Sequence, residues 1–499
     1  MKINDILKKC TTKYTLINKN NIYVKGITDS SQNVKKNFIF FAINGQFFNG
    51  EDFINSICHI ENIIILLSSN CDFRKKITNK NILKITLIQT KDLNKLAGEI
   101  SSIFYENNIK EKIAITGTNG KTSVTSYINQ IWRKLNHNSA SIGTLGFFYN
   151  NSPIASTLLT TPNPINLHKN LRKLTKKSCS RMVIEASSIG LEQDRLYPLK
   201  FDKIAFTNLS RDHLDYHKNI NNYRNSKLKL FNNYTKKKSI AVINSDNKYS
   251  NYFYNSCMAN KIKVLDYGKK ADFLKIITTQ NNIDILETKF LLKKKKYSFD
   301  FNSNTTFEIY NMICALILVF GKKLSIEDFK VINKIKNPEG RLEKIFNGIF
   351  KVFVDYAHTP DALRNVLESL NKIKKNRIVC VIGCGGDRDK GKRPLMTKQA
   401  LLFSDAVVIT DDNPRYENPK KIRNEMVEKV SKDDLSKIKS IGDREKAIKY
   451  AISIMHEKDI LLIAGKGHEK YQFIKDKKIF FSDKKVTLKI IKENGILDS

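Results

Sequence analysis

The sequence lacks any apolar run long enough to cross a membrane. Its longest apolar runs, NIIILL (62–67) and ICALILVF (313–320), fall far short of the ~20 residues that a spanning helix needs. The opening residues, MKINDILKKCTTKY, also lack the apolar stretch of a secretory signal peptide. We therefore expect a cytoplasmic protein without membrane insertion.

Cysteine is sparse, and its pattern excludes two common kinds of site. The eight cysteines are scattered, and no pair has the spacing of a zinc or redox site. Cys380 and Cys384 lie four residues apart around a glycine turn. We expect free thiols in a reducing cytosol.

Acidic residues are few: 49 Asp and Glu stand against 87 Lys and Arg, a formal net charge of +38. Such an excess is one sign of nucleic-acid binding, because Lys and Arg displace counterions from phosphate backbones. The alternative is biased composition, since lysine, asparagine and isoleucine are abundant throughout and no zinc-finger or aromatic-basic RNA-binding signature occurs. We favour biased composition and expect no nucleic-acid partner. The positive field would still favour small anionic substrates.

A chain of 499 residues is too long for one hydrophobic core, so we expect two to four domains. Three blocks are visible, and each contains short apolar runs that predict strands. In the first block these are residues 37–43, 62–67 and 84–90, followed by a helix over 92–108. In the second they are 112–116, 182–188, 203–210 and 239–246, with an edge hairpin near 270–305. In the third they fall within 351–358, 377–389, 405–415 and 459–469. The strands of the second block are apolar on both faces, which suits a parallel sheet covered by helices.

The segment 112–123, KIAITGTNGKTS, predicts a strand, a glycine turn and the start of a helix. Backbone N–H groups and a helix N-terminus in such a unit can wrap an anion. Lys121 would place its charge on the β- and γ-phosphates of a nucleotide, and Thr122 would offer a hydroxyl to Mg²⁺. The common phosphate-loop pattern has a glycine where this chain has Ile115, so a structural turn with a surface lysine is the alternative. We favour a nucleoside triphosphate site, because Lys and Thr directly follow the second glycine.

Two further residues are candidates for the metal. Glu185 ends an apolar run, where a carboxylate is costly unless it has a function. His213 lies in SRDHLDYH, directly after another apolar run. Either residue alone could be a cap or a hydrogen-bonding partner. Together with the phosphate loop they predict a Mg²⁺ site, because Mg²⁺ needs several ligands.

The loops of the third block carry charged residues of both signs. Ligands collect at the carboxyl ends of strands in open α/β sheets, so these loops predict a binding site. The guanidinium forks of Arg388 and Arg415 suit carboxylates. The acceptors available to ammonium groups are Asp412, Asn413, the Gly465 carbonyl and Glu469. The alternative for DDNPR (411–415) is a plain loop with an Asn-Pro turn and a salt bridge between Arg415 and an acid such as Asp411.

Eight motifs occur in the order known for the Mur ligases, and on these the chain resembles that family. They are TGTNGKTS, EASSIGLEQDRL, TNLSRDHLDYH, NPEGRLE, DYAHTPDAL, GCGGDRDKGKRP, DDNPR and GKGHE. In the first block only TDSS (28–31) and FFAINGQFFNG (40–50) are similar. The resemblance implies an α/β fold with three domains. These are a UDP-substrate-binding domain (1–88), a central parallel-sheet ATPase domain with the phosphate loop (89–337) and a C-terminal Rossmann-like domain for the amino acid (338–499).

The resemblance also implies site roles, which are carried over motif by motif. ATP would be held by Gly117, Thr118, Asn119, Gly120, Lys121, Thr122, Ser123, Asn311 and His358. Mg²⁺ would be held by Thr122, Glu185, His213 and Lys227, with His213 serving a second Mg²⁺ and Lys227 carrying a carbamate. Lys121, Lys227 and His213 would be catalytic. The UDP-muramyl-dipeptide would contact Ser30, Thr160, Thr161, Ser187, Gln193 and Arg195. Diaminopimelate would contact Arg388, Asp412, Asn413, Pro414, Arg415, Gly465 and Glu469.

Some positions depart from the family's pattern or leave a choice. The carbamylated lysine aligns with Lys227 by motif spacing, although Lys229 stands two residues away. Four residues replace the types usual in the family: Ser31, Phe47, Ile189 and Glu308. These departures affect the expected nucleotide-sugar and nucleotide contacts, not the expected reaction.

The implied reaction joins meso-2,6-diaminopimelate to UDP-N-acetylmuramoyl-L-alanyl-D-glutamate in cytoplasmic peptidoglycan precursor synthesis. ATP converts the side-chain carboxylate of D-glutamate into an acyl phosphate, and the incoming amine then displaces phosphate. We expect these small molecules as the partners of a monomer. Three alternatives stay open: a folylpolyglutamate synthase, which shares the phosphate loop, a ligase that adds lysine, and a basic nucleic-acid-binding ATPase.

Overall fold

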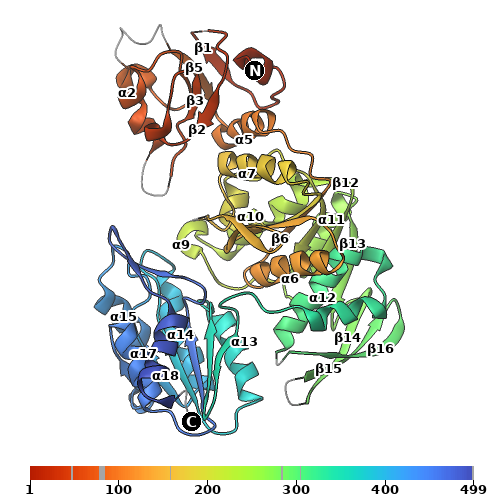
Figure 1. The fold of residues 1–499 in the computed structure, drawn as a ribbon, viewed down its shortest axis with the longest axis vertical. Coiled ribbons are helices and arrows are strands. Elements are labelled where there is room, and N and C mark those ends of the chain that lie inside the picture. Colours follow the sequence, from red (N-terminus) through yellow and green to blue (C-terminus); the bar gives the residue numbers. More distant parts are fainter. Residues whose placement is uncertain are drawn as a thin grey trace. The chain divides into compact units, whose positions relative to one another are not determined.

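The computed structural model of the chain describes residues 1–18, 20–45, 49–77, 85–157, 159–282, 285–303 and 305–496. The chain consists of two compact units (Figure 1). One is formed by Met1–Ala114, Leu135–Ile204 and Lys229–Ser239, and the other by Ile115–Lys134, Ala205–Leu228 and Ile240–Ser499. The predicted α/β class is confirmed, because helices alternate with strands that pair mostly in parallel. The division into three domains at 88/89 and 337/338 stays a prediction. No helix in the described ranges is long and apolar enough to span a membrane.

The first sheet has five strands in the order β1-β5-β4-β3-β2. The pairs β2/β3, β3/β4 and β4/β5 are parallel, and β1 pairs with β5 in the antiparallel sense. The strands are β1 (Thr15–Ile17), β2 (Gly26–Thr28), β3 (Phe38–Phe41), β4 (Ile64–Ser68) and β5 (Thr86–Thr90). The three strands predicted for this block are confirmed as β3, β4 and β5. The predicted helix over 92–108 is confirmed as α5 (Leu93–Phe104).

Both faces of the first sheet are covered because its strands are apolar on both sides. On one face Ile39, Phe41 and Leu66 pack with Leu96 and Ile100 of α5. The short elements around this sheet are α1 (Ile3–Leu7), η1 (Ser31–Asn33), η2 (Gly50–Phe53), α2 (Ile54–Ile57) and α3 (Phe73–Lys76).

The second sheet has eleven strands in the order β16-β15-β14-β13-β12-β11-β6-β10-β7-β8-β9. Its bounds are β6 (Glu111–Thr116), β7 (Ser139–Gly143), β8 (Gly146–Tyr149), β9 (Ser152–Ala155), β10 (Arg181–Glu185), β11 (Phe201–Phe206), β12 (Thr235–Asn244), β13 (Lys263–Gly268), β14 (Leu274–Asn282), β15 (Ile285–Leu292) and β16 (Lys295–Phe301). The four strands predicted for this block are confirmed as β6, β10, β11 and β12. The predicted edge hairpin is larger than expected, since β14, β15 and β16 form a three-stranded antiparallel extension.

The helices of the second block separate its strands in sequence, as expected for βα units. They are α6 (Lys121–Lys134), α7 (Pro164–Lys176), α8 (Ser188–Glu192), α9 (Leu214–His217), α10 (Ile220–Asn233), α11 (Ser250–Ala259) and α12 (Thr306–Phe320), followed by η3 (Gly321–Lys323) and η4 (Ile326–Lys334). The apolar run 313–320 lies in α12, where most of its side chains are buried.

The third sheet has six strands in the order β17-β18-β22-β19-β20-β21. All neighbours pair in parallel except β17/β18. The strands are β17 (Glu343–Asn347), β18 (Lys351–Asp355), β19 (Ile378–Ile382), β20 (Ala406–Ile409), β21 (Ile438–Ser440) and β22 (Ile460–Ala464). The four strands predicted for this block are β18, β19, β20 and β22, so each motif loop leaves the carboxyl end of a parallel strand.

Helices flank the third sheet and bury both of its faces. One core contains Leu363, Leu367 and Met396, and the other contains Ile448 and Ile491. The helical elements are α13 (Pro360–Asn371), η5 (Lys390–Lys392), α14 (Arg393–Phe403), α15 (Pro419–Val427), α16 (Lys432–Leu435), α17 (Arg444–Ser453) and α18 (Asp483–Glu493). A separate hairpin, β23 (Tyr471–Ile474) with β24 (Lys477–Phe480), follows β22.

Candidate active site

The predicted phosphate loop is confirmed as a strand–turn–helix unit. Strand β6 ends at Thr116 and α6 begins at Lys121, so the turn is Gly117–Gly120. Gly120 has φ +87°, and a Cβ there would lie 2.5 Å from Oδ1 of Asn311, so a larger residue would collide. This close approach places Asn311, from α12, directly against the turn. The Lys121 ammonium donates to the carbonyls of Gly117 at 2.7 Å and Thr118 at 2.8 Å.

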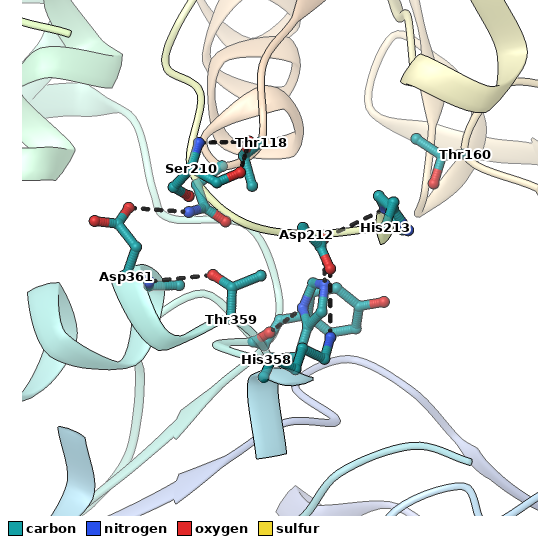
Figure 2. Close-up of polar contacts among 12 residues, drawn as sticks. Thr118, Thr160, Ser210, Asp212, His213, His358, Thr359 and Asp361 are labelled. Carbon is teal, nitrogen blue, oxygen red and sulfur yellow. Dashed lines mark hydrogen bonds and ion pairs between the residues drawn. The ribbon is translucent and has the colours of Figure 1, made fainter. Parts of the chain in front are cut away.

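The segment after β11 supports the turn through reciprocal hydrogen bonds. The Thr118 N–H donates to the Asn208 carbonyl at 2.8 Å, and the Thr118 hydroxyl donates to the Ser210 carbonyl at 3.2 Å. The Ser210 N–H donates back to that hydroxyl at 3.0 Å. From the other side, the Asn119 side-chain amide donates to Asp361 of α13 at 3.4 Å (Figure 2). The loop is therefore fixed before any ligand binds.

Lys227 of α10 approaches the same turn from the protein interior. Its side chain is 1% exposed, its Nζ donates to the Gly117 carbonyl at 2.8 Å, and it lies 4.4 Å from the centre of the Tyr223 ring. Burial, reinforced by the charge of Lys121, holds the pKa of Lys227 well below its ordinary value. Lys229 is different, since its ammonium pairs with Glu192 at 3.2 Å and is partly exposed.

A buried carboxylate, Asp212, joins the segment after β11 to the third block. One of its oxygens lies 3.3 Å from Nε2 of His213 and 3.6 Å from Nε2 of His358, and the other lies 3.4 Å from Nζ of Lys392 (Figure 2). Burial raises the pKa of Asp212, but its interactions with His213 and Lys392 outweigh burial and hold that pKa well below its usual range. Burial lowers the pKa of His213 to about 4, with Asp212 opposing.

Asp212 and Arg341 have contacts here that their sequence motifs did not predict. Asp212 could have been suspected, because it directly precedes His213 in the motif SRDH. Arg341 donates to the Thr122 hydroxyl at 3.1 Å and stacks 4.4 Å from the Tyr356 ring centre. That contact depends on the approach of NPEGR to the phosphate loop, which the sequence does not reveal.

Five of the six residues predicted to contact the UDP-muramyl-dipeptide lie in one cluster of the other unit. The Thr161 hydroxyl donates to the Glu185 carbonyl at 2.8 Å and lies 2.9 Å from the Ser187 hydroxyl. Arg195 donates to the Thr161 carbonyl at 3.0 Å and to Gln193 at 2.7 Å. The Thr160 hydroxyl lies 3.2 Å from that of Thr144, which in turn donates to the Glu185 carboxylate at 3.2 Å.

The sixth residue, Ser30, lies in the first block of the same unit. Its N–H donates to the Thr28 hydroxyl at 3.1 Å, and the neighbouring Asp29 accepts a 2.7 Å hydrogen bond from Asn163. Asn163 caps α7 two residues after Thr161, so the Ser30 loop adjoins the Thr161 segment.

Three of the four residues that depart from the family's pattern lie in described elements. Ser31 opens η1 and Ile189 lies in α8. Glu308, in the first turn of α12, is buried and accepts hydrogen bonds from Ser303 and Asn337. Phe47 lies outside the described residues.

In the third block, the two arginines predicted to bind carboxylates gather around the loop after β19. A Cβ on Gly385 would lie 2.8 Å from Nη1 of Arg415 and 3.8 Å from Cγ of Arg388. Arg415 donates to the Gly386 carbonyl at 2.7 Å and to the Asn413 carbonyl at 3.4 Å. The alternative pairing of Arg415 with Asp411 is not found: Asp411 pairs with Arg423. Burial, then the charge of Arg388, lowers the pKa of Arg415.

The predicted acceptors form a second, mostly buried group beside these arginines. Asn413 is 4% exposed, and its amide donates to Oε2 of Glu469 at 2.8 Å. Oδ2 of Asp412 would lie 2.8 Å from a Cβ on Gly465, so the loop after β20 touches the loop after β22. Burial raises the pKa of Asp412, but the charges of Lys466 and Arg444 outweigh it and hold that pKa below its ordinary value. Pro414 presents its carbonyl so close to Gly386 that a Cβ there would clash at 2.0 Å.

The predicted metal ligands are divided between the two units. Thr122, His213 and Lys227 belong to one unit and Glu185 to the other. Within the described residues, no group of three or more His, Cys, Asp and Glu side chains could hold a metal ion.

Comparison with known proteins gives the family of the chain. Residues 115–319 match the Mur ligase middle domain, and residues 340–467 match the glutamate ligase domain of Mur ligases. The chain belongs to the Mur ligase family. The UDP-N-acetylmuramoyl-L-alanyl-D-glutamate–2,6-diaminopimelate ligase of Rickettsia typhi is 38% identical over 481 residues, which cover 94% of each chain.

Solved structures extend the comparison. A structure of a UDP-N-acetylmuramoyl-L-alanyl-D-glutamate–2,6-diaminopimelate ligase is 28% identical, with a TM-score of 0.62 and 95% of each chain covered. A Mycobacterium tuberculosis folylpolyglutamate synthase complexed with ADP and AMPPCP has the same TM-score over 75% of this chain and 92% of its own. At 16% identity that likeness shows the fold alone.

Proposed function

We propose that the chain is an ATP-dependent ligase that adds meso-2,6-diaminopimelate to UDP-N-acetylmuramoyl-L-alanyl-D-glutamate. The observation that carries the proposal is the group of charged side chains in the third block, which is proposed as the amino-acid pocket. It sets Arg388 and Arg415, which donate to backbone carbonyls, beside the carboxylates Asp412 and Glu469. A substrate with two amino-acid ends carries charges of both signs that match this pocket. Relatives that cover nearly the whole chain are named for the same reaction.

ATP is proposed to bind at residues 117–123. Backbone N–H groups at the start of α6 would donate to a phosphate, and Lys121 would exchange its two carbonyl acceptors for phosphate oxygens. Asn311 lies against Gly120 and is proposed to contact the adenine, while His358 is proposed to lie near the nucleotide.

Carbamylation of Lys227 is proposed because its surroundings favour the neutral amine. A neutral amine reacts with CO₂, whereas an ammonium does not, and the depressed pKa of Lys227 makes the neutral form available. The product is an anion that attracts the Lys121 ammonium, whereas the ammonium form of Lys227 would be repelled by it. The buried ammonium, by contrast, has the Gly117 carbonyl and the Tyr223 ring as its partners.

The residues proposed to hold Mg²⁺ suit this ion only if Lys227 is carbamylated. The Thr122 hydroxyl and a carbamate on Lys227 are oxygen donors, and the phosphates of ATP would supply others. His213 and, from the other unit, Glu185 are the further proposed ligands. Bound Mg²⁺ would neutralise charge that develops on the transferred phosphoryl group.

The cluster of Thr160, Thr161, Ser187, Gln193 and Arg195, with Ser30, is proposed to hold the UDP-muramyl-dipeptide. Arg195 offers a cation to a carboxylate or phosphate of the substrate, and the hydroxyls offer donors for its remaining oxygens. The side-chain carboxylate of D-glutamate then attacks the γ-phosphate of ATP. The resulting acyl phosphate loses phosphate when the amine of diaminopimelate attacks its carbonyl carbon.

The organisation proposed for this reaction is three domains, 1–88, 89–337 and 338–499, in a cytoplasmic monomer. The substrates are proposed as its partners, with neither nucleic acid nor membrane insertion. Domain closure would bring the amine to the acyl phosphate and exclude water.

The proposal is tested by ADP release in a coupled assay. The protein is given ATP, Mg²⁺ and UDP-N-acetylmuramoyl-L-alanyl-D-glutamate with diaminopimelate, lysine or glutamate, and separately ATP with RNA or DNA. We expect ADP release with diaminopimelate and a loss of several orders of magnitude in Lys121→Ala, whose circular dichroism should be unchanged. Release driven by nucleic acid, or wild-type turnover by Lys121→Ala, would contradict the proposal.

A further inference from the structure

Lys466 lies in the loop after β22, and its ammonium is completely buried beneath the amino-acid pocket. Its Nζ has three acceptors: Asn413 Oδ1 at 3.1 Å, Glu469 Oε2 at 3.0 Å and the Tyr471 carbonyl at 2.8 Å. An ammonium has three donors, so its hydrogen-bonding capacity is fully used. A buried charge is tolerated only with such partners. Glu469 and Tyr471 follow Lys466 in the same segment, and Asn413 lies on the loop after β20, so the lysine ties these two segments together.

The lysine helps to fix which end of the Asn413 amide faces a ligand. Oδ1 of Asn413 accepts from Lys466 and also from the Phe473 N–H at 3.0 Å, so both of its lone pairs are used. The amide nitrogen donates one hydrogen to Glu469. Only the second N–H remains for a ligand, and an N–H recognises a carboxylate. This differs from the expectation that the Asn413 oxygen would accept from an ammonium.

Glu469 is oriented in the same way. Its Oε2 accepts from both Lys466 and Asn413. In the described part of the chain no residue donates to Oε1, so this oxygen is available to a substrate ammonium. The pocket thus presents a donor at Asn413, on the same loop as Arg415, and an acceptor at Glu469.

We propose that Lys466 is a positioning residue that sets the polarity of the amino-acid pocket and thereby its preference for diaminopimelate over lysine. Without the ammonium, Oδ1 of Asn413 keeps only the Phe473 N–H as a donor, so the amide is held less firmly, and Glu469 loses its buried counter-charge. The distal carboxylate of diaminopimelate would then meet a less firmly oriented N–H at Asn413, and its ammonium would meet a less firmly placed carboxylate at Glu469. This inference rests on the proposed function, which supplies the substrate.

The test replaces Lys466 by methionine, which has a similar length and no charge. For Lys466→Met we expect the KM for diaminopimelate to rise 10- to 100-fold and the preference over lysine to fall by a similar factor. The KM values for ATP and for the UDP-muramyl-dipeptide should stay within twofold, because their proposed sites lie elsewhere. Lys470→Met, which removes an exposed lysine four residues away, is the matched control and should be silent.

The outcomes separate the inference from the proposed function. If the wild type does not use diaminopimelate, the proposed function fails. If it does, but Lys466→Met changes all three KM values alike or none, the inference is overturned. Should the methionine variant not fold, Lys466→Gln takes its place, with a smaller rise in the KM for diaminopimelate expected, because its amide can still donate to Asn413 while the charge beside Glu469 is lost. Loss of near-ultraviolet circular dichroism in both variants would make Lys466 a residue of the fold and would also overturn the inference.

Discussion

At the scale of single residues, Arg415 is held in place without being neutralised. It donates to backbone carbonyls, its own backbone has φ +50°, and its N–H donates to the Phe473 carbonyl. Within the described ranges it has no ion pair with a carboxylate. Because Arg388 lies beside it, a ligand carboxylate that binds both guanidinium groups would relieve their repulsion.

This arrangement predicts how the enzyme discriminates between amino acids. Lysine lacks the second carboxylate of diaminopimelate, so its binding would leave Arg415 without an anionic partner. A charge-assisted hydrogen bond contributes roughly 1.5–3 kcal/mol, and each ~1.4 kcal/mol is tenfold in rate. We expect wild-type kcat/KM for diaminopimelate to exceed that for lysine by about 10²-fold or more. Arg415→Ala should lose most of its diaminopimelate activity and little lysine activity.

The control for Arg415→Ala is Arg423→Ala. It also removes one arginine, but from a position where the side chain pairs with Asp411. It should keep the preference for diaminopimelate. Equal use of lysine and diaminopimelate by the wild type would rule out the role of Arg415.

Lys227 carries a second prediction at this scale. Lys227→Ala should be inactive, because the carbamate would be lost, and short carboxylates such as acetate or formate should restore part of the activity by occupying the vacated space. Lys229→Ala, two residues along the same helix, should be nearly silent, since its ammonium is partly exposed and paired with Glu192. ADP release measured across a series of acetate concentrations checks both. Rescue of Lys229→Ala instead of Lys227→Ala would show that the modified lysine is misassigned.

At the scale of elements, two loops with different proposed substrates are joined by an ion pair. Arg211, one residue after Ser210 of the phosphate-loop support, makes a bidentate contact with Asp389, with both distances 3.0 Å. Asp389 directly follows Arg388 of the amino-acid pocket, and the Arg211 guanidinium lies so close to Gly391 that a Cβ there would clash at 2.3 Å. The pair therefore couples the nucleotide loop to the amino-acid loop.

The coupling can be measured with a double-mutant cycle on kcat/KM. Arg211→Gln and Asp389→Asn should each lower kcat/KM for diaminopimelate about five- to tenfold. The double variant should lose no more than the worse single variant, because the same interaction is removed once. The expected coupling energy is roughly 1 kcal/mol, a modest value because the Arg211 side chain is nearly half exposed. Independent, multiplying losses would show that the pair does not act as a unit.

How much of this could be predicted depends on whether a feature is local. Strands such as β6, β19 and β22 were predicted, because a buried parallel strand must be apolar on both faces. The turn at 117–120 was predicted from its glycines. The additional strand in the extension β14–β16 was not, since alternating polar and apolar residues there also suit a simple hairpin.

Among the proposed site residues, too, only local features could be predicted from the sequence. Charged motif residues such as Arg415 were predicted because their side chains have few structural uses in a loop. Asp212, Arg341 and Lys466 were not assigned roles, because each also depends on a partner that is distant in sequence. The orientation of the Asn413 amide depends on Lys466 and Phe473, so no local pattern could have given it.

At the scale of the whole molecule, stability in acid depends on histidines that fold in the neutral form. Burial lowers the pKa of His168, in α7, to about 4. Burial, then the charge of Arg341, lowers the pKa of His468 to about 3. The unfolded chain takes up protons at the ordinary histidine pKa of 6.5, whereas the folded chain does not until the pH is much lower. The unfolded state therefore binds more protons between about pH 4 and 6.5, and stability falls as the pH falls through that window.

His168 isolates one part of this effect, because its side chain is fully buried and far in sequence from every proposed substrate contact except the Thr160–Thr161 segment. The lowered pKa of His168 should reduce the free energy of unfolding by roughly 2 kcal/mol between pH 7.5 and pH 5, and should have no effect above about pH 7.5. His168→Leu replaces the imidazole with an apolar side chain that cannot take up a proton. Urea unfolding of this variant at a series of pH values should therefore show a shallower decline in the free energy of unfolding than the wild type below pH 6.5.

His59→Leu, at an exposed position, should follow the wild-type curve. Parallel curves for the wild type and His168→Leu would mean that His168 is already protonated in the folded chain, and would contradict the assigned shift.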